Sequence, residues 1–261
     1  MSKRKILLAA LSLCMIAILA AGGTLAYLID TEQQMNTFTA GKIFIELDET
    51  KIAEGENGFP VATAERTGEN QVYKLRPGIT VAKDPTVTLK EGSEDAYMGA
   101  IITITCADAK VYDERGNETT ETMGLYDLIG VEGSFDIDIT KDGMVTGGLF
   151  EDTGAQAALN GLAVYETEKC YIYQDAAKAE SAKEWKLYIF LKNAYQRDNS
   201  IADDDAEVLF TNLNVPADYA NSEMAVLGNL KIEIAAYAAQ ADGFMDCYTA
   251  LTTAFPDDWS F

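Results

Sequence analysis

The 261-residue sequence contains no histidine. This absence excludes the Ser-His-Asp triad, the Cys-His pair and the His-Glu-x-x-His zinc site, because each needs an imidazole as base or ligand. The sequence also lacks a Gly-x-Ser-x-Gly motif, a phosphate-binding glycine loop and a dinucleotide-binding fingerprint. A glycosidase-type pair of carboxylates stays open, although 42 acidic residues make any one pair uninformative. We therefore expect no catalytic residues and no enzymatic activity.

Basic residues are scarce: 20 Lys and Arg stand against 42 Asp and Glu, which gives a net charge of −22. Nucleic acids and anionic lipid surfaces are polyanions, so this charge excludes both as partners. A strongly acidic chain instead suits a soluble protein with a well-solvated surface.

Cysteine is also rare, with four residues in the whole chain. Cys14 lies in the first apolar run, which leaves Cys106, Cys170 and Cys247 further along. An odd number of three cysteines is no disulfide framework. We interpret them as small buried apolar residues and leave one disulfide open.

Only one long apolar run is present, from Ile6 to Ala21, with basic residues at 3–5 before it and small residues after it. This order is typical of a secretory signal peptide, and the run is shorter than the ~20 residues of a membrane-spanning helix. We predict that residues 1–26 are a signal peptide, cut by signal peptidase between Ala26 and Tyr27. A permanent membrane anchor is the disfavoured alternative. Cleavage removes three basic residues, takes the net charge from −22 to −25, and leaves no membrane contact.

The remaining chain is dominated by the pattern of β-strands. Apolar and polar residues alternate with period two, which places one set of side chains on a buried face and the other toward solvent. The clearest cases are Ile43–Leu47, Ile102–Cys106, Phe135–Ile139, Trp185–Lys192 and Lys231–Ile234. Four further runs look like strands: Thr80–Leu89, Val145–Phe150, Val164–Tyr173 and Glu207–Leu213. The polar stretch from Asp48 to Gln71 predicts a surface loop or a β excursion.

Helical signals are few and short. Candidate helices cover Thr120–Ile129, Ala176–Lys183, Asn221–Leu227 and Gly243–Ala254. Asp142-Gly143 predicts a hairpin turn after the strand at 135–140. Many short strands with few helices predict a mainly β fold, a jelly-roll-like β-sandwich, formed as one domain by residues 39–261.

Two groups of side chains are candidate binding residues. Asp203, Asp204 and Asp205 form the densest acidic cluster, which would bind calcium through oxygen ligands or form a solvated loop. The spacing supports no calcium motif, so we favour the loop and expect no cofactor. Several aromatic residues in predicted strands would line a ligand-binding face or serve packing, namely Tyr165, Tyr171, Tyr173, Trp185 and Tyr188.

The N-terminal sequence resembles a known family. The residues that carry the resemblance are Gly22-Gly23-Thr24-Leu25-Ala26-Tyr27, Asp30-Thr31-Glu32 and Asn36-Thr37-Phe38-Thr39-Ala40-Gly41, with weaker similarity at Leu75-Arg76-Pro77-Gly78, Lys83-Asp84-Pro85-Thr86-Val87 and Ile234–Ala241. This pattern is similar to SipW-dependent exported proteins of the TasA and camelysin family. The resemblance implies a jelly-roll-like β-sandwich at the surface of a Gram-positive bacterium of the Firmicutes, or secreted from it. Camelysin is classed as a metallopeptidase, an activity that we do not transfer to a chain without histidine.

The resemblance also implies a mode of assembly. Matrix members of the family form biofilm fibres in which the segment after the cleavage site inserts as a strand into the next subunit. That segment is 27–38 here, and its apolar anchors are Tyr27, Leu28, Ile29, Met35 and Phe38. The same segment would equally serve as the chain's own first strand. The expected function is that of an exported structural subunit whose partner is itself or a related matrix protein, and a surface ligand-binding module is the alternative.

Overall fold

The computed structural model describes residues 29–31, 42–125, 145–150, 155–174, 183–196 and 205–261. In this part of the chain the fold is mainly β, with antiparallel sheets and two short helices, which confirms the predicted class. No helix among the described residues is long and apolar enough to cross a lipid bilayer. The predicted signal peptide and the Asp142-Gly143 hairpin lie outside the described residues.

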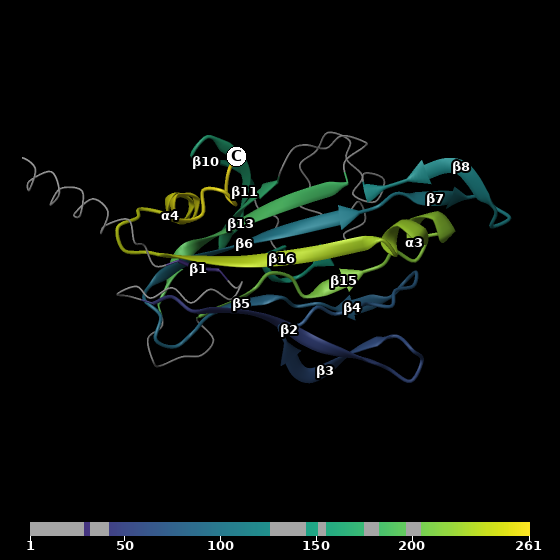
Figure 1. The fold of residues 1–261 in the computed structure, drawn as a ribbon, viewed down its shortest axis with the longest axis horizontal. Coiled ribbons are helices and arrows are strands. Elements are labelled where there is room, and N and C mark those ends of the chain that lie inside the picture. Colours follow the sequence, from purple (N-terminus) through teal and green to yellow (C-terminus); the bar gives the residue numbers. More distant parts are fainter. Residues whose placement is uncertain (1–28, 32–41, 126–144, 151–154, 175–182, 197–204) are drawn as a thin grey trace, which may run out of the picture.

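The largest sheet has seven strands in the order β1-β16-β6-β13-β12-β11-β10. Its strands are β1 (Ile29–Thr31), β16 (Leu230–Gln240), β6 (Ala96–Cys106), β13 (Glu184–Tyr195), β12 (Cys170–Gln174), β11 (Leu162–Glu166) and β10 (Ala155–Leu159). All its pairs are antiparallel. The long strands β16, β6 and β13 lie side by side in this sheet, and the three-residue β1 covers only part of the outer edge of β16 (Figure 1).

Smaller sheets form a second layer beneath it (Figure 1). A four-stranded sheet has the order β14-β5-β2-β3, and a three-stranded sheet has the order β4-β15-β9. Their strands are β14 (Ala206–Val208), β5 (Thr86–Leu89), β2 (Ile45–Glu54), β3 (Pro60–Thr67), β4 (Thr80–Ala82), β15 (Asn212–Asn214) and β9 (Val145–Thr146). This strand order shows several antiparallel sheets, and the jelly-roll description stays a prediction.

The remaining elements lie around these layers. A hairpin of β7 (Ala109–Tyr112) and β8 (Glu118–Met123) projects beside helix α3 (Asn221–Leu227) (Figure 1). The predicted helix at 120–129 is therefore wrong in its first half, because Thr-rich β8 pairs with β7. The predicted strand at 145–150 is confirmed only at β9, since Gly148–Phe150 forms the 3₁₀ turn η1.

The main hydrophobic core fills the space between the two layers. Strands β6 and β13 contribute Ile102 and Ile189, β5 contributes Val87 and Leu89, and the link between β14 and β15 contributes Phe210, all fully buried. Burying these apolar side chains drives the packing of the two layers at roughly 25 cal/mol per Å².

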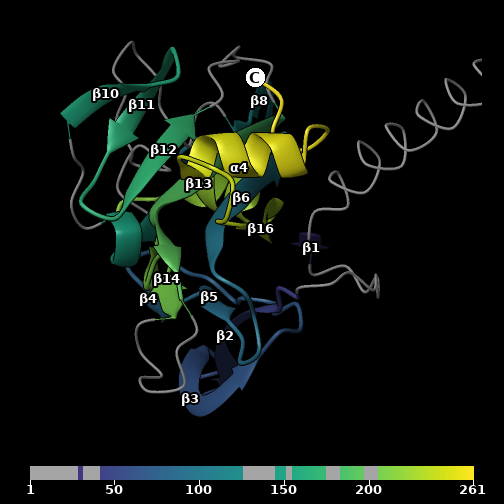
Figure 2. The ribbon, with the colours of Figure 1, turned by 90° about the vertical axis from the view of Figure 1, so that its left-hand side faces the viewer.

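A second core covers the opposite face of the large sheet. Helix α4 (Cys247–Ala254) lies across that face (Figure 2), where Leu251 and Trp259 pack on Tyr188 and Phe190. The alternation in β13 placed Tyr188 and Phe190 toward solvent, and this interpretation was wrong, because α4 and the segment after it cover them. Central strands buried on both faces carry apolar residues in both alternating sets.

Candidate functional site

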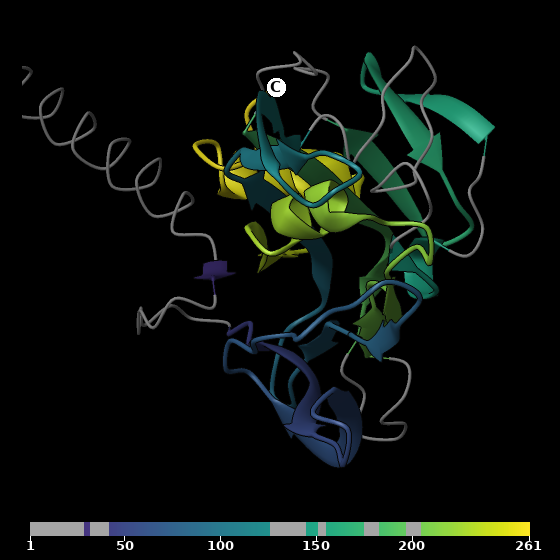
Figure 3. The same cartoon turned by 90° about the vertical axis from the view of Figure 1, so that its right-hand side faces the viewer.

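The N-terminal strand β1 lies on the outer edge of β16, where Figure 3 shows it beside the body of the molecule. Its three residues pair antiparallel with Tyr237–Ala239, so that Ile29 faces Ala239 and Thr31 faces Tyr237. On its other side β16 pairs with β6 along its whole length of 11 residues. In the described part of the chain, no strand covers the outer edge of Leu230–Ala236.

This uncovered edge carries two different rows of side chains. Lys231, Glu233 and Ala235 are exposed, whereas Ile232 and Ile234 are partly buried and pack against the main core. The alternation follows from the period of a strand, whose successive residues point to opposite faces. An edge with free backbone donors and acceptors and a neighbouring apolar row is suited to accept another strand.

The predicted donor residues are only partly described. Ile29 lies in β1, and the segment around it forms the chain's own first strand, which was one of the two interpretations. The other predicted anchors, Tyr27, Leu28, Met35 and Phe38, lie outside the described residues together with the cleavage site after Ala26.

Only one of the three residues considered for calcium binding lies in the described part of the chain. Asp203 and Asp204 lie outside the described residues, and Asp205 is 1% exposed with its backbone carbonyl accepting a hydrogen bond from Leu89 N at 2.8 Å. No group of three or more acidic or cysteine side chains in the described ranges is placed to hold a metal ion.

The aromatic candidates do not form one binding face. Register explains why: Tyr165 pairs with Ile172 on β12, so Tyr165 lies on the face opposite to Tyr171 and Tyr173. Tyr165 and Trp185 belong to the main core, whereas Tyr173 and Tyr188 lie under the C-terminal segment. The interpretation as a single ligand-binding face was therefore wrong, and packing explains these residues.

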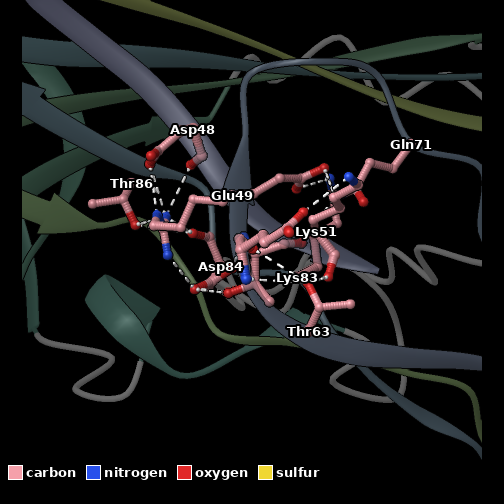
Figure 4. A network of polar contacts seen from close by, with 11 residues as sticks. Asp48, Glu49, Lys51, Thr63, Gln71, Lys83, Asp84 and Thr86 are labelled. Atoms are coloured by element: carbon pink, nitrogen blue, oxygen red, sulfur yellow. Dashed lines mark hydrogen bonds and ion pairs between the residues drawn. The ribbon is translucent and has the colours of Figure 1, made fainter. Parts of the chain in front are cut away.

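A polar network that sequence reasoning missed surrounds β2 (Figure 4). Arg66 on β3 reaches across β2, where its Nε donates to Asp48 Oδ1 at 2.9 Å and its Nη1 donates to Asp84 Oδ2 at 2.8 Å. Its Nη2 donates to Thr86 Oγ1 at 2.7 Å. The planar guanidinium group of arginine can donate these hydrogen bonds to several acceptors at once. The compact ammonium group of lysine does not have this planar arrangement of donors.

Asp84 holds β2 where the strand carries a bulge between Thr50 and Ile52. The Asp84 carboxylate accepts from Thr50 N at 2.6 Å and from Thr50 Oγ1 at 2.8 Å. Partial burial acts to raise the pKa of Asp84, but the hydrogen bonds from Thr50 and Arg66 outweigh it and lower the pKa. The side-chain hydrogen bond to Asp48 raises the pKa of Arg66 despite its partial burial.

Glu49 and Lys83 form the buried part of the network. Lys83 Nζ donates to Glu49 Oε2 at 2.6 Å, and the two side chains are only 10% and 12% exposed. The other carboxylate oxygen accepts from Gln71 Nε2 at 2.9 Å and from the Tyr73 hydroxyl at 3.2 Å. Burial and the neighbouring Glu49 carboxylate raise the pKa of Tyr73 well above its usual value, so Tyr73 stays a neutral donor.

The network lies entirely within the part of the chain that matches a known family. Residues 2–126 match the family described as camelysin metallo-endopeptidase. Over these residues the chain is similar to the camelysin family, which includes TasA-like SipW-dependent exported proteins. The matched segment covers β1 to β8, and the edge strand β16 lies outside it. Comparison with curated proteins and with solved structures found no match.

The description of the matched family implies a catalytic metal, so the side chains that could bind a metal ion have to be compared with that expectation. A peptidase zinc site is built from histidine with carboxylate or thiolate ligands, and the sequence has no histidine. The acidic side chains of the network, Asp48, Glu49 and Asp84, are each paired with Arg66 or Lys83. These residues do not fit a zinc ion, because cationic side chains occupy the positions that a metal would take.

Some residues of the network belong to a motif that was recognisable in the sequence. Lys83, Asp84 and Thr86 belong to the family-like motif that begins at Lys83, and the structure gives each of them a partner on β2 or β3. Glu49, Arg66 and Gln71 carried no signal, because a single acidic, basic or amide residue in a polar stretch has no distinguishing pattern.

Proposed function

We propose that this chain is an exported structural subunit of the cell surface or extracellular matrix, of the biofilm-fibre type. We propose further that it polymerises when its N-terminal segment 27–38 pairs as a strand with a neighbouring subunit. The observation that supports this most strongly is the pairing of β1 with only three of the 11 residues of the edge strand β16. Camelysin-family proteins are typically exported, which fits an extracellular role.

The short pairing matters because strand pairing gains stability with each added residue. A three-residue contact satisfies few of the backbone groups that β16 presents. A longer strand from another subunit would satisfy more of them and fill the apolar row beside Ile232 and Ile234. Such a contact is head-to-tail, so it propagates into a filament instead of closing into a ring.

Leader cleavage would control this exchange. Cleavage between Ala26 and Tyr27 would release the segment that carries β1 only after export, which would restrict assembly to the outside of the cell. A peptidase role receives no support from the residues of the network, whose acidic side chains are neutralised by Arg66 and Lys83.

The proposal is tested by comparing two purified chains, residues 27–261 and residues 39–261. Electron microscopy and size-exclusion chromatography should show fibres or heterogeneous oligomers for the longer chain and a monomer for the shorter one. A labelled peptide of residues 27–38 should bind the shorter chain, whereas a scrambled peptide of the same composition should not. Two identical monomer peaks, with no peptide binding, would contradict polymerisation by strand donation.

The exported location has its own test. N-terminal sequencing of the product recovered from the culture medium or cell surface should begin at Tyr27. A product retained in the membrane with its leader attached would contradict this part of the proposal.

A further inference from the structure

The buried pair of Lys83 and Glu49 has a third member that an ordinary ion pair does not need. Glu49 Oε2 accepts from Lys83 Nζ at 2.6 Å, and Glu49 Oε1 accepts from Gln71 Nε2 at 2.9 Å. One carboxylate therefore binds both a primary amine and a primary carboxamide. The amine is shielded from solvent, since Lys83 is 8% exposed.

The carboxamide of Gln71 is fixed by three backbone or side-chain contacts. Its Oε1 accepts from Ile52 N at 2.7 Å, and its Nε2 donates to Thr50 O at 2.9 Å as well as to Glu49. The amine and the amide are held by the two oxygens of one carboxylate, and holding two reacting groups in one site favours an intramolecular reaction.

We propose that Lys83 and Gln71 form an intramolecular isopeptide cross-link, with Glu49 as the proton relay. In the reaction, Lys83 Nζ gives a proton to Glu49 and attacks the Gln71 Cδ atom, which forms the new C–N bond. Glu49 then passes that proton to Nε2 of Gln71, the Cδ–Nε2 bond breaks, and ammonia leaves. Nζ gives its second proton to Glu49, and the departing ammonia takes this proton up, so that ammonium is released and Glu49 ends as a carboxylate. No electrons are exchanged with an outside group, so the step needs neither an oxidant nor a cofactor.

The surroundings supply what such a step requires. The tetrahedral intermediate carries negative charge on Gln71 Oε1, and the Ile52 N–H already points at that atom. A preorganised donor at this position acts like an oxyanion hole. The Tyr73 hydroxyl donates a hydrogen bond to Glu49 Oε1 at 3.2 Å and so holds the carboxylate that relays the proton in place.

The cross-link would join two segments that secondary structure leaves separate. Gln71 lies in the segment 68–79 between β3 and β4, which we call the strap. Lys83 lies in the link between β4 and β5. A covalent bond between them would fasten the strap over the bulge of β2. This is a useful property in a chain whose Cys106, Cys170 and Cys247 are all unpaired.

The test is mass spectrometry of the purified full-length product after proteolytic digestion. The expected result is a linked pair of peptides that contains Gln71 and Lys83, with a mass lower by one ammonia, about 17 Da, than the sum of the two. Recovery of both residues in separate, unmodified peptides overturns the proposal. This wild-type measurement needs no variant, so it does not depend on whether a substitution disturbs folding.

Three variants then test the roles of the residues. Lys83→Arg should abolish the linked peptide, and Glu49→Gln should abolish it because the relay is lost. Lys90→Arg is the matched control, because Lys90 forms an exposed ion pair with Glu46 and should leave the cross-link intact. A cross-link that persists in Glu49→Gln overturns the role of Glu49.

Discussion

The backbone of Asp30 pairs with Ala238, and this contact places the N-terminal strand β1 beside β16 near the opposite end of the sequence. β1 pairs with Tyr237–Ala239, whereas no described strand pairs with the outer edge of β16 earlier in the strand, at Lys231 and Glu233. One strand therefore contains both a covered and an uncovered section of sheet edge. The chain's own N-terminal segment covers the smaller section.

Proline substitutions in β1 should release this pairing. Neighbouring backbone N–H groups point to opposite sides of a strand, so one of Asp30→Pro and Thr31→Pro must remove a donor that faces β16. We expect faster hydrogen exchange at Tyr237–Ala239 in that variant, measured by mass spectrometry, with unchanged exchange in β13. Thr31→Val keeps the N–H group and is the matched control. Equal exchange in all of these proteins would show that β1 contributes no protection.

Gly99 on β6 should be intolerant of a side chain. A Cβ atom at this position would lie 2.6 Å from Leu251 Cδ1, 2.8 Å from the Ile189 carbonyl oxygen and 2.8 Å from the Trp259 ring. Gly99→Ala must therefore displace α4, the segment that carries Trp259 and the backbone of β13 at Ile189. We expect the free energy of unfolding to fall by about 1–3 kcal/mol, measured by chemical denaturation.

The control for Gly99 is Gly228 at the end of α3. Gly228 has a helical φ of −65°, and an added Cβ would meet the Met224 carbonyl oxygen at an ordinary 3.4 Å. Gly228→Ala should cause no loss of stability. If both variants are equally stable, α4 does not pack on the sheet as closely as the structure shows.

Asp84 should make stability depend on acid pH. Hydrogen bonds from Thr50 and Arg66 lower its pKa below 3.8 in the folded state against the opposing effect of burial. The folded protein therefore binds this proton less well than the unfolded chain, so the stabilisation is present above about pH 4 and is lost as the pH falls through the folded-state pKa.

The comparison of wild type with Asp84→Asn isolates this contribution. The variant should be less stable by about 1.5–3 kcal/mol near neutral pH, the usual value for a hydrogen bond to a charged group. The difference should shrink as the pH falls below about 4, because the unfolded wild-type chain then binds a proton on Asp84 that the folded protein binds only at lower pH. Glu65→Gln removes an exposed partner of Lys51 and should cost at most about 1 kcal/mol. A difference that does not change with pH would show that Asp84 is not ionised in the network.

Local sequence patterns predicted several elements at their observed places. Helix α3 has the predicted bounds, and α4 forms the C-terminal part of the helix predicted at 243–254. Asp246 caps α4 by accepting from Thr249 N at 2.7 Å, a contact between near neighbours in sequence. One local signal was overlooked: Asn160-Gly161 adopts positive φ angles of 47° and 91° in the turn between β10 and β11.

Features that depend on contacts between distant segments could not be predicted. The alternation of β13 gave no sign that Tyr188 and Phe190 would be buried, because their cover is α4, formed far along the chain. The network needs Glu49, Gln71 and Lys83 to meet, and only the bulge of β2 and the path of the strap bring them together. The pattern of residues in a single sequence does not show which side chains from three distant segments will come into contact.

The three described cysteines should be unreactive in the folded protein. Burial raises the pKa of Cys106, and it raises the pKa of both Cys170 and Cys247 to about 11. A thiol reacts as its thiolate, so at pH 8 these groups present little nucleophile, and burial also blocks the reagent. An aromatic disulfide reagent should therefore label none of them until denaturant is added.

The number of thiols labelled in denaturant also reports on the leader. Three thiols are expected if residues 1–26 have been removed, and four if the leader is retained, because Cys14 lies within it. A count of one would mean that two of the buried cysteines form a disulfide, which would contradict the structure, where all three are free. Rapid labelling without denaturant would instead show that the strands or helix that cover these residues open readily.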